Sequence, residues 1–497
     1  ESRLSSRLGT ITNPMRGGTL RPNRIYPLAL IAFALAPSPS GRAANVPRIP
    51  AEVRRTAESL REKAFTGTRA AEWVRGLVDT AGSRLSGSPG DKAAIEWGVA
   101  TLKRLGFASV RAEKLMGPYW VRGVETGEVI APYPHKLFLT ALGGSVPTAD
   151  AGLEAEILEV GSLEELDARK EADVRGKIVF FNKRMQRTLD GAGYGKAVDV
   201  RGRGASRAAK LGAVGVIIRS IGTDSNRTPH TGGMRYLDGI PKIPAAAVSN
   251  PDADLLERLG DEGKPVRVRF TLGCRDMGQA ETANVIGEIP GRGSPKEIVL
   301  LGCHRDAWEL GTGAEDDGAG CGIVIEAARL IAGLGNRPRR TIRVVLYANE
   351  ENGLAGGKAY VADHAAELPL HAAALEADLG SGRPIGFSWN AGPSSVPLMK
   401  EISSLLEPLG AGELTPDGLG GADISPLVLS GVPLFAVRQE ASRYFDLHHT
   451  ANDTFDKIDV GSLDKMTAAV AAFAYVAAST KEPFEKIPAE KRKLPEF

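Results

Sequence analysis

Acidic residues and histidines follow several strand-like apolar runs of this 497-residue chain. A histidine and several aspartates follow the run 297–303, and a Glu-Glu pair follows 341–347. An aspartate follows 371–377, and a loop with two adjacent histidines follows 432–437. The residues in this pattern are His304, Asp306, Asp316, Glu350, Glu351, Asp378, His448 and His449. Ligands of open α/β sheets bind outside the carboxyl ends of the strands, so we expect a two-metal hydrolytic site there.

The side-chain types in this pattern suit zinc, which binds imidazole nitrogens and carboxylate oxygens at about 2.0–2.2 Å. Each motif alone has an ordinary explanation. Asp316 and Asp317 could cap a helix, and Glu350 and Glu351 could favour a helix N-terminus through the macrodipole. Their joint occurrence at one edge of a predicted sheet favours a metal site. Because side chains of consecutive residues diverge, one glutamate can bind metal while its neighbour faces the reacting water.

Composition and missing motifs exclude several other classes. The 62 basic and 60 acidic side chains leave a formal net charge of +2, so no strong field attracts nucleic acid or an anionic membrane. The sequence contains no His-Glu-x-x-His helix, phosphate loop or Gly-x-Ser-x-Gly elbow. Cys274, Cys303 and Cys321 have neither metal-finger nor redox spacing. We expect Cys303 to be a small, packed strand residue and not a ligand.

The elements that must position these residues follow from apolar periodicity, which predicts helices over 50–65, 69–80 and 92–105. Short β-rich runs then predict an inserted module, and regular strand–helix alternation from about residue 282 predicts a mostly parallel sheet. We therefore predict an α/β fold with a mixed sheet sandwiched by helices and a smaller, β-rich insert. The predicted segments are a leader at 1–44, the first part of the main domain at 45–126, the insert at 127–272, the metal-bearing part at 273–480 and a surface tail at 481–497.

The N-terminal segment is typical of a secretory signal peptide. Arginines precede an apolar run at 28–36, and small residues follow it. The run is too short to span a bilayer, which takes about 20 apolar residues, and no other segment is long and apolar enough. We therefore predict an exported protein, periplasmic or extracellular, with Met15 as the start of the leader and no membrane span after its removal.

Three motifs, at 304–320, 349–353 and 449–454, closely resemble those of the co-catalytic zinc exopeptidases. That family includes bacterial leucine-type aminopeptidases and glutamate carboxypeptidases. Trp308 and the string at 420–426 fit its carboxypeptidase Q branch. Parts of the insert resemble the protease-associated domain that such enzymes carry, namely 175–179, 208–214 and 243–248.

The resemblance implies two zinc ions per chain, with Asp316 bridging them. His304 and Asp378 would complete the coordination of one ion. Glu351 and His449 would complete the coordination of the other, where His449 is preferred over its neighbour because of its spacing to the following aspartate.

The resemblance also implies roles for residues that do not bind metal. Glu350 would be the general base that takes a proton from a metal-bridged water, and Asp306 the carboxylate that orients His304. His448 stands where several relatives have tyrosine, so a role as oxyanion donor is open. Asp423 lies where relatives line the substrate cleft, and a contact to a terminal amine and a plain loop aspartate are equally open.

The function implied by the resemblance is hydrolysis of dipeptides or of terminal residues of short peptides. A glutamate-type carboxypeptidase, which needs a basic pocket, is an alternative. A receptor-like relative without chemistry and a single-zinc glutaminyl cyclase are others, both disfavoured by the full ligand pattern. The expected partner is a peptide substrate, and a homodimer is expected from the resemblance alone.

Overall fold

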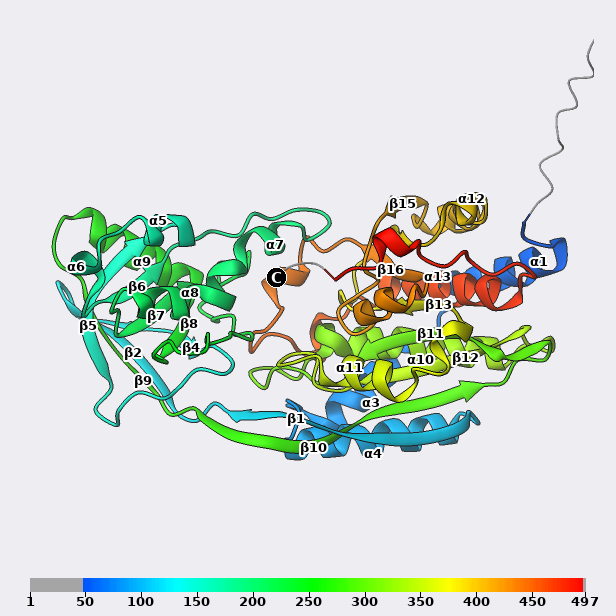
Figure 1. Cartoon of the computed structure of the whole chain (residues 1–497), viewed down its shortest axis with the longest axis horizontal. Helices are drawn as coiled ribbons and strands as arrows, with labels where there is room; N and C mark the ends of the chain where they lie inside the picture. Colours follow the sequence, from blue (N-terminus) through cyan, green and yellow to red (C-terminus); the bar gives the residue numbers. More distant parts are fainter. Residues whose placement is uncertain (1–47, 495–497) are drawn as a thin grey trace, which may run out of the picture. The chain divides into compact units, whose positions relative to one another are not determined.

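The computed structural model describes residues 48–494. The predicted leader and its start at Met15 lie outside the described residues. The described chain contains two mixed, eight-stranded sheets with helices packed on them (Figure 1). This confirms the predicted α/β class with a mixed main sheet.

The first sheet has the strand order β1-β10-β12-β11-β13-β16-β14-β15. Its central strands β12, β11, β13 and β16 run parallel to one another, whereas β1, β10 and β14 are antiparallel to their neighbours toward the centre. The strands are β1 (Ala108–Val121), β10 (Arg275–Ile289), β11 (Ser294–His304), β12 (Arg340–Tyr347), β13 (His371–Glu376), β14 (Pro384–Asn390), β15 (Glu413–Pro416) and β16 (Leu434–Gln439).

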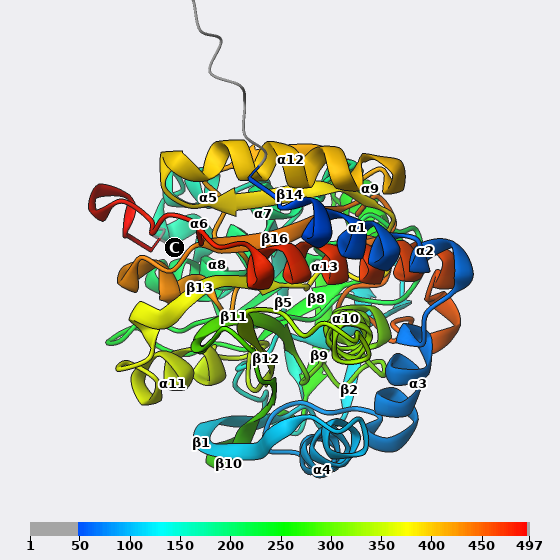
Figure 2. The same cartoon turned by 90° about the vertical axis from the view of Figure 1, so that its right-hand side faces the viewer.

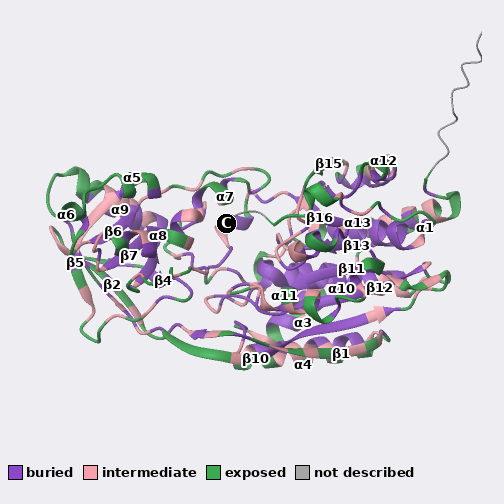
Figure 3. Ribbon diagram, viewed as in Figure 1, coloured by how far each residue is buried: buried purple, intermediate pink, exposed green. Residues whose placement is uncertain are grey.

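Helices cover both faces of this sheet, which explains the continuous apolar runs of its central strands. Along β11, Val299 and Leu301 join the apolar core beneath α3, α4, α10 and α13, whereas Ile298 and Leu300 face the core beneath α11 (Figure 2). The helices are α1 (Ala51–Arg61), α2 (Lys63–Thr66), α3 (Ala70–Ala81), α4 (Pro89–Arg104), α10 (Ala319–Ala332), α11 (Ala355–Asp363), α12 (Val396–Leu406) and α13 (Val460–Ser479). Helix α13 is alanine-rich and buried along most of its length (Figure 3).

The second sheet belongs to the insert and has the order β3-β2-β9-β5-β6-β7-β8-β4. Strands β5, β6, β7 and β8 are parallel, and α8 (Asp199–Lys210) shares an apolar core with them. The strands are β2 (Glu125–Ala131), β3 (His135–Leu137), β4 (Leu139–Ala141), β5 (Leu153–Val160), β6 (Ile178–Phe181), β7 (Gly215–Arg219), β8 (Ala245–Val248) and β9 (Arg267–Leu272). The remaining helices are α5 (Leu163–Asp167), α6 (Glu171–Val174), α7 (Gly193–Ala197) and α9 (Asn250–Asp261).

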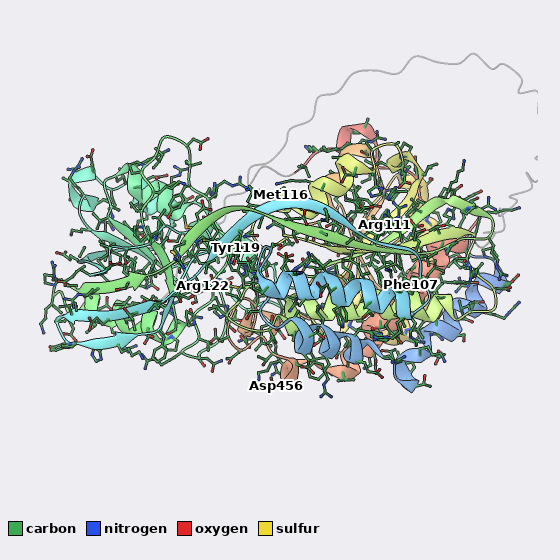
Figure 4. The ribbon with its side chains drawn as sticks, turned by 90° about the horizontal axis from the view of Figure 1, so that it is seen from below. Phe107, Arg111, Met116, Tyr119, Arg122 and Asp456 are labelled. Carbon is green, nitrogen blue, oxygen red and sulfur yellow. The ribbon has the colours of Figure 1, made fainter. Side chains whose placement is uncertain are left out.

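The chain enters and leaves the insert through one antiparallel ribbon, formed by β1 and β10. Pairing continues to the insert end of the ribbon, where Trp120 is opposite Asp276 and Val121 is opposite Arg275. Figure 4 shows this ribbon from below. The residues labelled there on or next to β1 are Phe107, Arg111, Met116, Tyr119 and Arg122.

The first helix and the C-terminal tail differ from the expectations. The predicted helix over 50–65 is divided at Glu62 into α1 and α2. The tail predicted to run over the surface is anchored instead, because Phe484 and Ile487 are buried in the two cores of the first sheet. Between residues 48 and 494, no helix is long and apolar enough to cross a membrane.

Candidate active site

The site lies where the four parallel central strands of the first sheet end. His304 is the last residue of β11, and Glu351 follows β12. Asp378 follows β13, and His449 lies in the loop after β16. Carboxyl ends of parallel strands meet at one edge of a sheet, so residues far apart in the sequence converge there.

The carboxylate of Asp316 lies between two histidines, His304 and His449. Its Oδ1 is 3.2 Å from His304 Nε2, and its Oδ2 is 3.1 Å from His449 Nε2. It belongs to the irregular π-helical turn Ala314–Gly318, whose main-chain N–H groups at Glu315 and Asp316 donate to the Asp453 carboxylate at 2.7 and 3.1 Å. The turn therefore presents one carboxylate oxygen to each side, as a bridging ligand requires.

The predicted ligands form two groups around Asp316. On one side, His304 Nε2 is 3.4 Å from Asp378 Oδ1. On the other, His449 Nε2 is 3.0 Å from Glu351 Oε2. Ligand atoms able to share one ion occur in two sets within the described chain, namely His304, Asp316 and Asp378, and Asp316, His448 and His449. The second set includes His448, which the sequence left open.

The electrostatics of these groups are those of a buried acidic cluster. Burial alone would lower the pKa of His304, but Asp378 and Asp316 raise it well above its usual range. Burial would raise the pKa of Asp316, whereas His304 and His449 lower it well below normal. Buried charges must be paired or bind metal, and here imidazoles are the nearest partners of the carboxylates.

The side chain of Asp306 is hydrogen-bonded to the main chain at Glu350 and Glu351. Asp306 accepts hydrogen bonds from the N–H groups of Glu350 (3.1 Å) and Glu351 (3.4 Å). The contact to His304 Nδ1 is made by the Asp306 carbonyl oxygen at 3.0 Å, while the carboxylate Oδ1 is 4.0 Å away. The main chain of Asp306 thus orients His304, and its carboxylate holds the Glu-Glu turn. Burial, reinforced by Glu351, raises the pKa of Glu350 well above its usual range.

The insert contributes contacts to the histidine loop that sequence reasoning missed. His230 Nδ1 is 2.7 Å from the His448 carbonyl, so it must donate, and the Thr231 N–H donates to the His449 carbonyl at 3.0 Å. In return His449 Nδ1 lies 3.3 Å from the Thr231 carbonyl. Such an outer contact fixes the tautomer that leaves Nε2 free for a metal. The partners are 218 positions apart, and no local signal could have revealed them.

His448 stacks on His449, with ring centroids 3.5 Å apart. Its Nε2 is 3.5 Å from Asp316 Oδ2, and its Nδ1 is buried without a hydrogen-bond partner among the described residues. Burial, with a further contribution from His449, lowers the pKa of His448 well below its usual value. A neutral imidazole at this place can bind a metal or donate one hydrogen bond.

Arg201 of α8 is a third residue of the insert that sequence reasoning missed. Arg201 is only 8% exposed, yet its Nε has no hydrogen-bond partner among the described residues, and its Nη1 makes a long contact of 3.4 Å with the Thr231 carbonyl. Its Nη2 donates to the Tyr194 hydroxyl at 2.5 Å. A Cβ on Gly232 would collide with both the Arg201 guanidinium and His449. Arg201 therefore lies beside His449.

Asp423 is 1% exposed, and neither of its carboxylate oxygens has a hydrogen-bond partner within the described chain. Its main-chain N–H is 3.3 Å from Glu376. Burial, with a further contribution from Glu376, raises the pKa of Asp423 well above normal. The structure thus makes Asp423 a buried acid next to Glu376.

A cavity of about 170 Å³ opens beside Asp378. Its charged lining residues are Asp190 of the insert, Glu376, Asp378 and Arg438. Arg438 is already engaged by Glu413 at 3.1 Å. Three carboxyl groups and one guanidinium thus line the cavity, although burial, reinforced by Asp378, raises the pKa of Glu376 to about 8. Because its one cation is already paired, the cavity is more suitable for an amine than for an acidic side chain.

A mixed α/β fold with this cluster of imidazoles and carboxylates defines a metallohydrolase, and comparison with known proteins gives its family. The chain belongs to peptidase family M28. Residues 284–474 match the sequence profile of that family, and residues 127–256 match the PA domain. The chain is accordingly a metallo-exopeptidase, as its motifs predicted.

The relatives cover most of the chain. Carboxypeptidase Q of Mus musculus is 36% identical over 406 residues, which span 82% of this chain and 85% of the mouse protein. The crystal structure of a peptidase M28 precursor from Shewanella amazonensis has a TM-score of 0.86 and 43% identity, covering 88% of this chain and 99% of that one. BSAP, a zinc aminopeptidase from Bacillus subtilis, shares the fold with a TM-score of 0.60 at 21% identity, covering 86% and 98%.

Proposed function

We propose that this chain is a two-zinc exopeptidase that splits dipeptides or removes terminal residues from short peptides. Asp316 would bridge the ions, with His304 and Asp378 on one side and Glu351 and His449 on the other. The observation that carries this proposal is the position of Asp316, whose two oxygens face histidines at 3.2 and 3.1 Å.

The residues present fit zinc. All donors are imidazole or carboxylate groups, the types that zinc prefers. Asp316 Oδ2 is buried and accepts no hydrogen bond of acceptable geometry in the described chain, so a lone pair remains for a cation. Two ions, when bound, would supply Lewis-acid activation of the scissile carbonyl and of the attacking water.

The chain's own groups then handle the proton. The carboxylate of Glu350, which the resemblance assigns as general base, would take the proton from the attacking water and deliver it to the leaving amine. Burial and the neighbouring Glu351 raise the pKa of Glu350 above that of a free carboxyl group, which is the direction in which a glutamate general base is tuned. The Asp306 carboxylate keeps Glu350 in place by accepting a hydrogen bond from its main-chain N–H. His448 would donate a hydrogen bond to the developing oxyanion.

The two adjacent glutamates allow a sharp test of this assignment. Glu350→Gln should keep two zinc ions per chain and lose about 10²–10⁴-fold in kcat. Glu351→Gln should instead lose zinc from one position. The measurements are zinc content by mass spectrometry and hydrolysis of a dipeptide panel. A Glu350→Gln enzyme with wild-type activity would refute the base assignment, and an inert wild-type enzyme holding two zinc ions would favour the receptor-like alternative.

The charges around the site support recognition of both ends of a dipeptide. The acidic cavity beside Asp378 suits a free amino terminus. Arg201, on the side of His449, is a buried cation with no carboxylate within 4.0 Å among the described residues. Four other buried arginines, Arg219, Arg305, Arg340 and Arg343, pair with carboxylates. Buried Arg84 has all of its contacts with main-chain carbonyls instead, whereas Arg201 has neither arrangement in full because its Nε lacks a partner among the described residues. The carboxylate at the C-terminus of the substrate would be the partner of the Arg201 guanidinium.

End recognition is tested with free, N-blocked and C-amidated dipeptides. Hydrogen bonds to charged groups contribute about 1.5–3 kcal/mol, so amidation should lower kcat/KM by roughly 10–100-fold. Arg201→Gln should remove this discrimination. Arg203→Gln, on an exposed position of the same helix, is the matched control. Equal discrimination by wild type and Arg201→Gln would exclude the role of Arg201 and leave the zinc assignment intact.

A glutamate-type carboxypeptidase is the weaker candidate. It needs cations for a second substrate carboxylate, whereas the cavity beside Asp378 is acidic and its Arg438 is already paired with Glu413. Preferential cleavage of C-terminal glutamate in the dipeptide panel would reverse this ranking.

Export and dimerisation are further parts of the proposal. The apolar run at 28–36, with arginines before it and small residues after it, supports export. Amino-terminal sequencing of protein recovered outside the cytoplasm should reveal a mature terminus near residue 44. Light scattering should give twice the mass of one mature chain if the enzyme is a homodimer.

A further inference from the structure

Cys303 and Cys321 form a close pair of buried thiols directly behind the metal site. Their Sγ atoms are 2.7 Å apart, and both residues are 0% exposed. Non-bonded carbon atoms attract best at about 3.5–4.0 Å, and sulfur is the larger atom. The sulfurs are therefore closer than two free thiols would pack, although they are not at the bonded distance of about 2.0 Å.

The two cysteines lie at the ends of a segment that carries metal-site residues. Cys303 is the residue before His304 on β11, and Cys321 lies in the first turn of α10. They are 18 positions apart. The segment between them includes His304 and Asp316 and the irregular turn that presents Asp316. Cys321 Sγ also contacts the His304 carbonyl at 3.3 Å, so the pair holds together the two ends of the ligand-bearing segment.

We propose that Cys303 and Cys321 form a disulfide when the chain folds in an oxidising compartment, and that this bond closes the ligand-bearing segment before metal binds. The oxidant is a disulfide of the glutathione type. One protein thiolate attacks the oxidant and forms a mixed disulfide, and the second then displaces the remaining oxidant thiolate. One S–S bond forms in the protein, one is broken in the oxidant, and the two oxidant thiolates take up the protons that the cysteines lose.

Burial decides when this reaction can occur. Both cysteines are 0% exposed, so the folded dithiol is not accessible to an oxidant. The bond must form during folding and is afterwards protected from reductants. Cys274, whose Sγ contacts the Ser145 carbonyl at 3.2 Å in the apolar core of the insert, remains the single free thiol.

The inference does not depend on the proposed peptidase chemistry, because the readout is the state of the thiols. Full-length protein is directed to an oxidising compartment, purified as the folded fraction, denatured without reductant in the presence of an alkylating agent, and analysed by peptide mass. We expect one alkylated cysteine, Cys274, and a linked peptide pair containing Cys303 and Cys321. Cys274→Ser should leave no free thiol, and Cys321→Ser should leave two.

Three alkylated cysteines, or a bond that involves Cys274, would overturn the proposal. Thermal melting provides a second readout. Protein with the bond should melt a few degrees above protein made in a reducing compartment, because the crosslink restricts the unfolded chain. The double variant Cys303→Ser, Cys321→Ser should melt at one temperature in both preparations. A melting difference that persists in this variant would contradict the role of the bond.

Discussion

Removal of His230 should weaken zinc binding, although this residue is not a ligand. The His230 imidazole donates to the His448 carbonyl at 2.7 Å, and its Nε2 is 2.7 Å from Asp224 Oδ1. Since a carbonyl can only accept, Nδ1 is the donor of the first hydrogen bond. His230→Ala therefore leaves a buried carbonyl and a buried carboxylate without their main partner.

The magnitude follows from the hydrogen bonds that are lost. A buried polar group left without its partner costs about 1–3 kcal/mol, and about 1.4 kcal/mol corresponds to a factor of ten in a binding constant. Loss of an outer contact to a metal ligand typically lowers metal affinity by about 10–100-fold. The effect should be confined to the ion that Glu351 and His449 would hold, because the ring of His230 bonds the histidine loop and Asp224.

The assay is competition for zinc with a chelator of known affinity, followed by the zinc content of the protein. Wild type should release its ions at similar chelator concentrations, whereas His230→Ala should release one ion about 10–100-fold more readily. His135→Ala, at an exposed position of the insert, is the control. Unchanged affinity of both ions in folded His230→Ala would refute the idea that the insert orients His449.

Two further predictions concern stability. His371 Nε2 accepts from the Tyr360 hydroxyl at 2.8 Å, and burial lowers the pKa of His371 to about 4. Between pH 6.5 and 4 the unfolded chain therefore binds more protons than the folded chain. The contribution of neutral His371 to the free energy of unfolding is present above pH 6.5 and declines by about 3 kcal/mol at most as the pH falls to 4. Urea unfolding of His371→Gln should lack this decline, and the same pH dependence of stability in wild type and variant would contradict the prediction. Gly143→Ala should destabilise the protein by about 1–3 kcal/mol, because its Cβ would overlap the Trp308 ring. Gly195→Ala is the control, because a Cβ there would meet no other atom of residues 48–494 within 4 Å, and equal urea midpoints for the two variants would exclude the overlap.

The main sheet and its site residues could be predicted because their signals are local. Strands buried on both faces read as continuous apolar runs, and His304 or Asp378 follows such a run directly. The same rule places their side chains at one edge of a parallel sheet. The interruption at Glu62 and the burial of Phe484 could not be predicted in this way, because they depend on packing between distant elements.

The contacts that the insert makes with the site could not be predicted from the sequence either. Thr231 acts on His449 through its carbonyl oxygen, which every residue has, so its side-chain type carries no signal. Arg201 lies in an ordinary helical segment, and its isolation from carboxylates is visible only after folding. Asp306 shows an intermediate case, because its importance was predicted while the atoms that make its contacts were not.

The β1–β10 ribbon makes the insert removable. Val121 and Arg275 are paired opposite each other where the chain leaves and re-enters the first sheet, so the whole stretch between them could be replaced by a short hairpin turn. Such a turn joins antiparallel neighbours without moving either strand. The shortened protein would keep every proposed zinc ligand, yet it would lack Thr231, His230 and Arg201. The fold thus separates the part that carries the proposed ligands from the part that holds the histidine loop, and the two parts meet in a shared apolar core that includes Leu85 and Trp308.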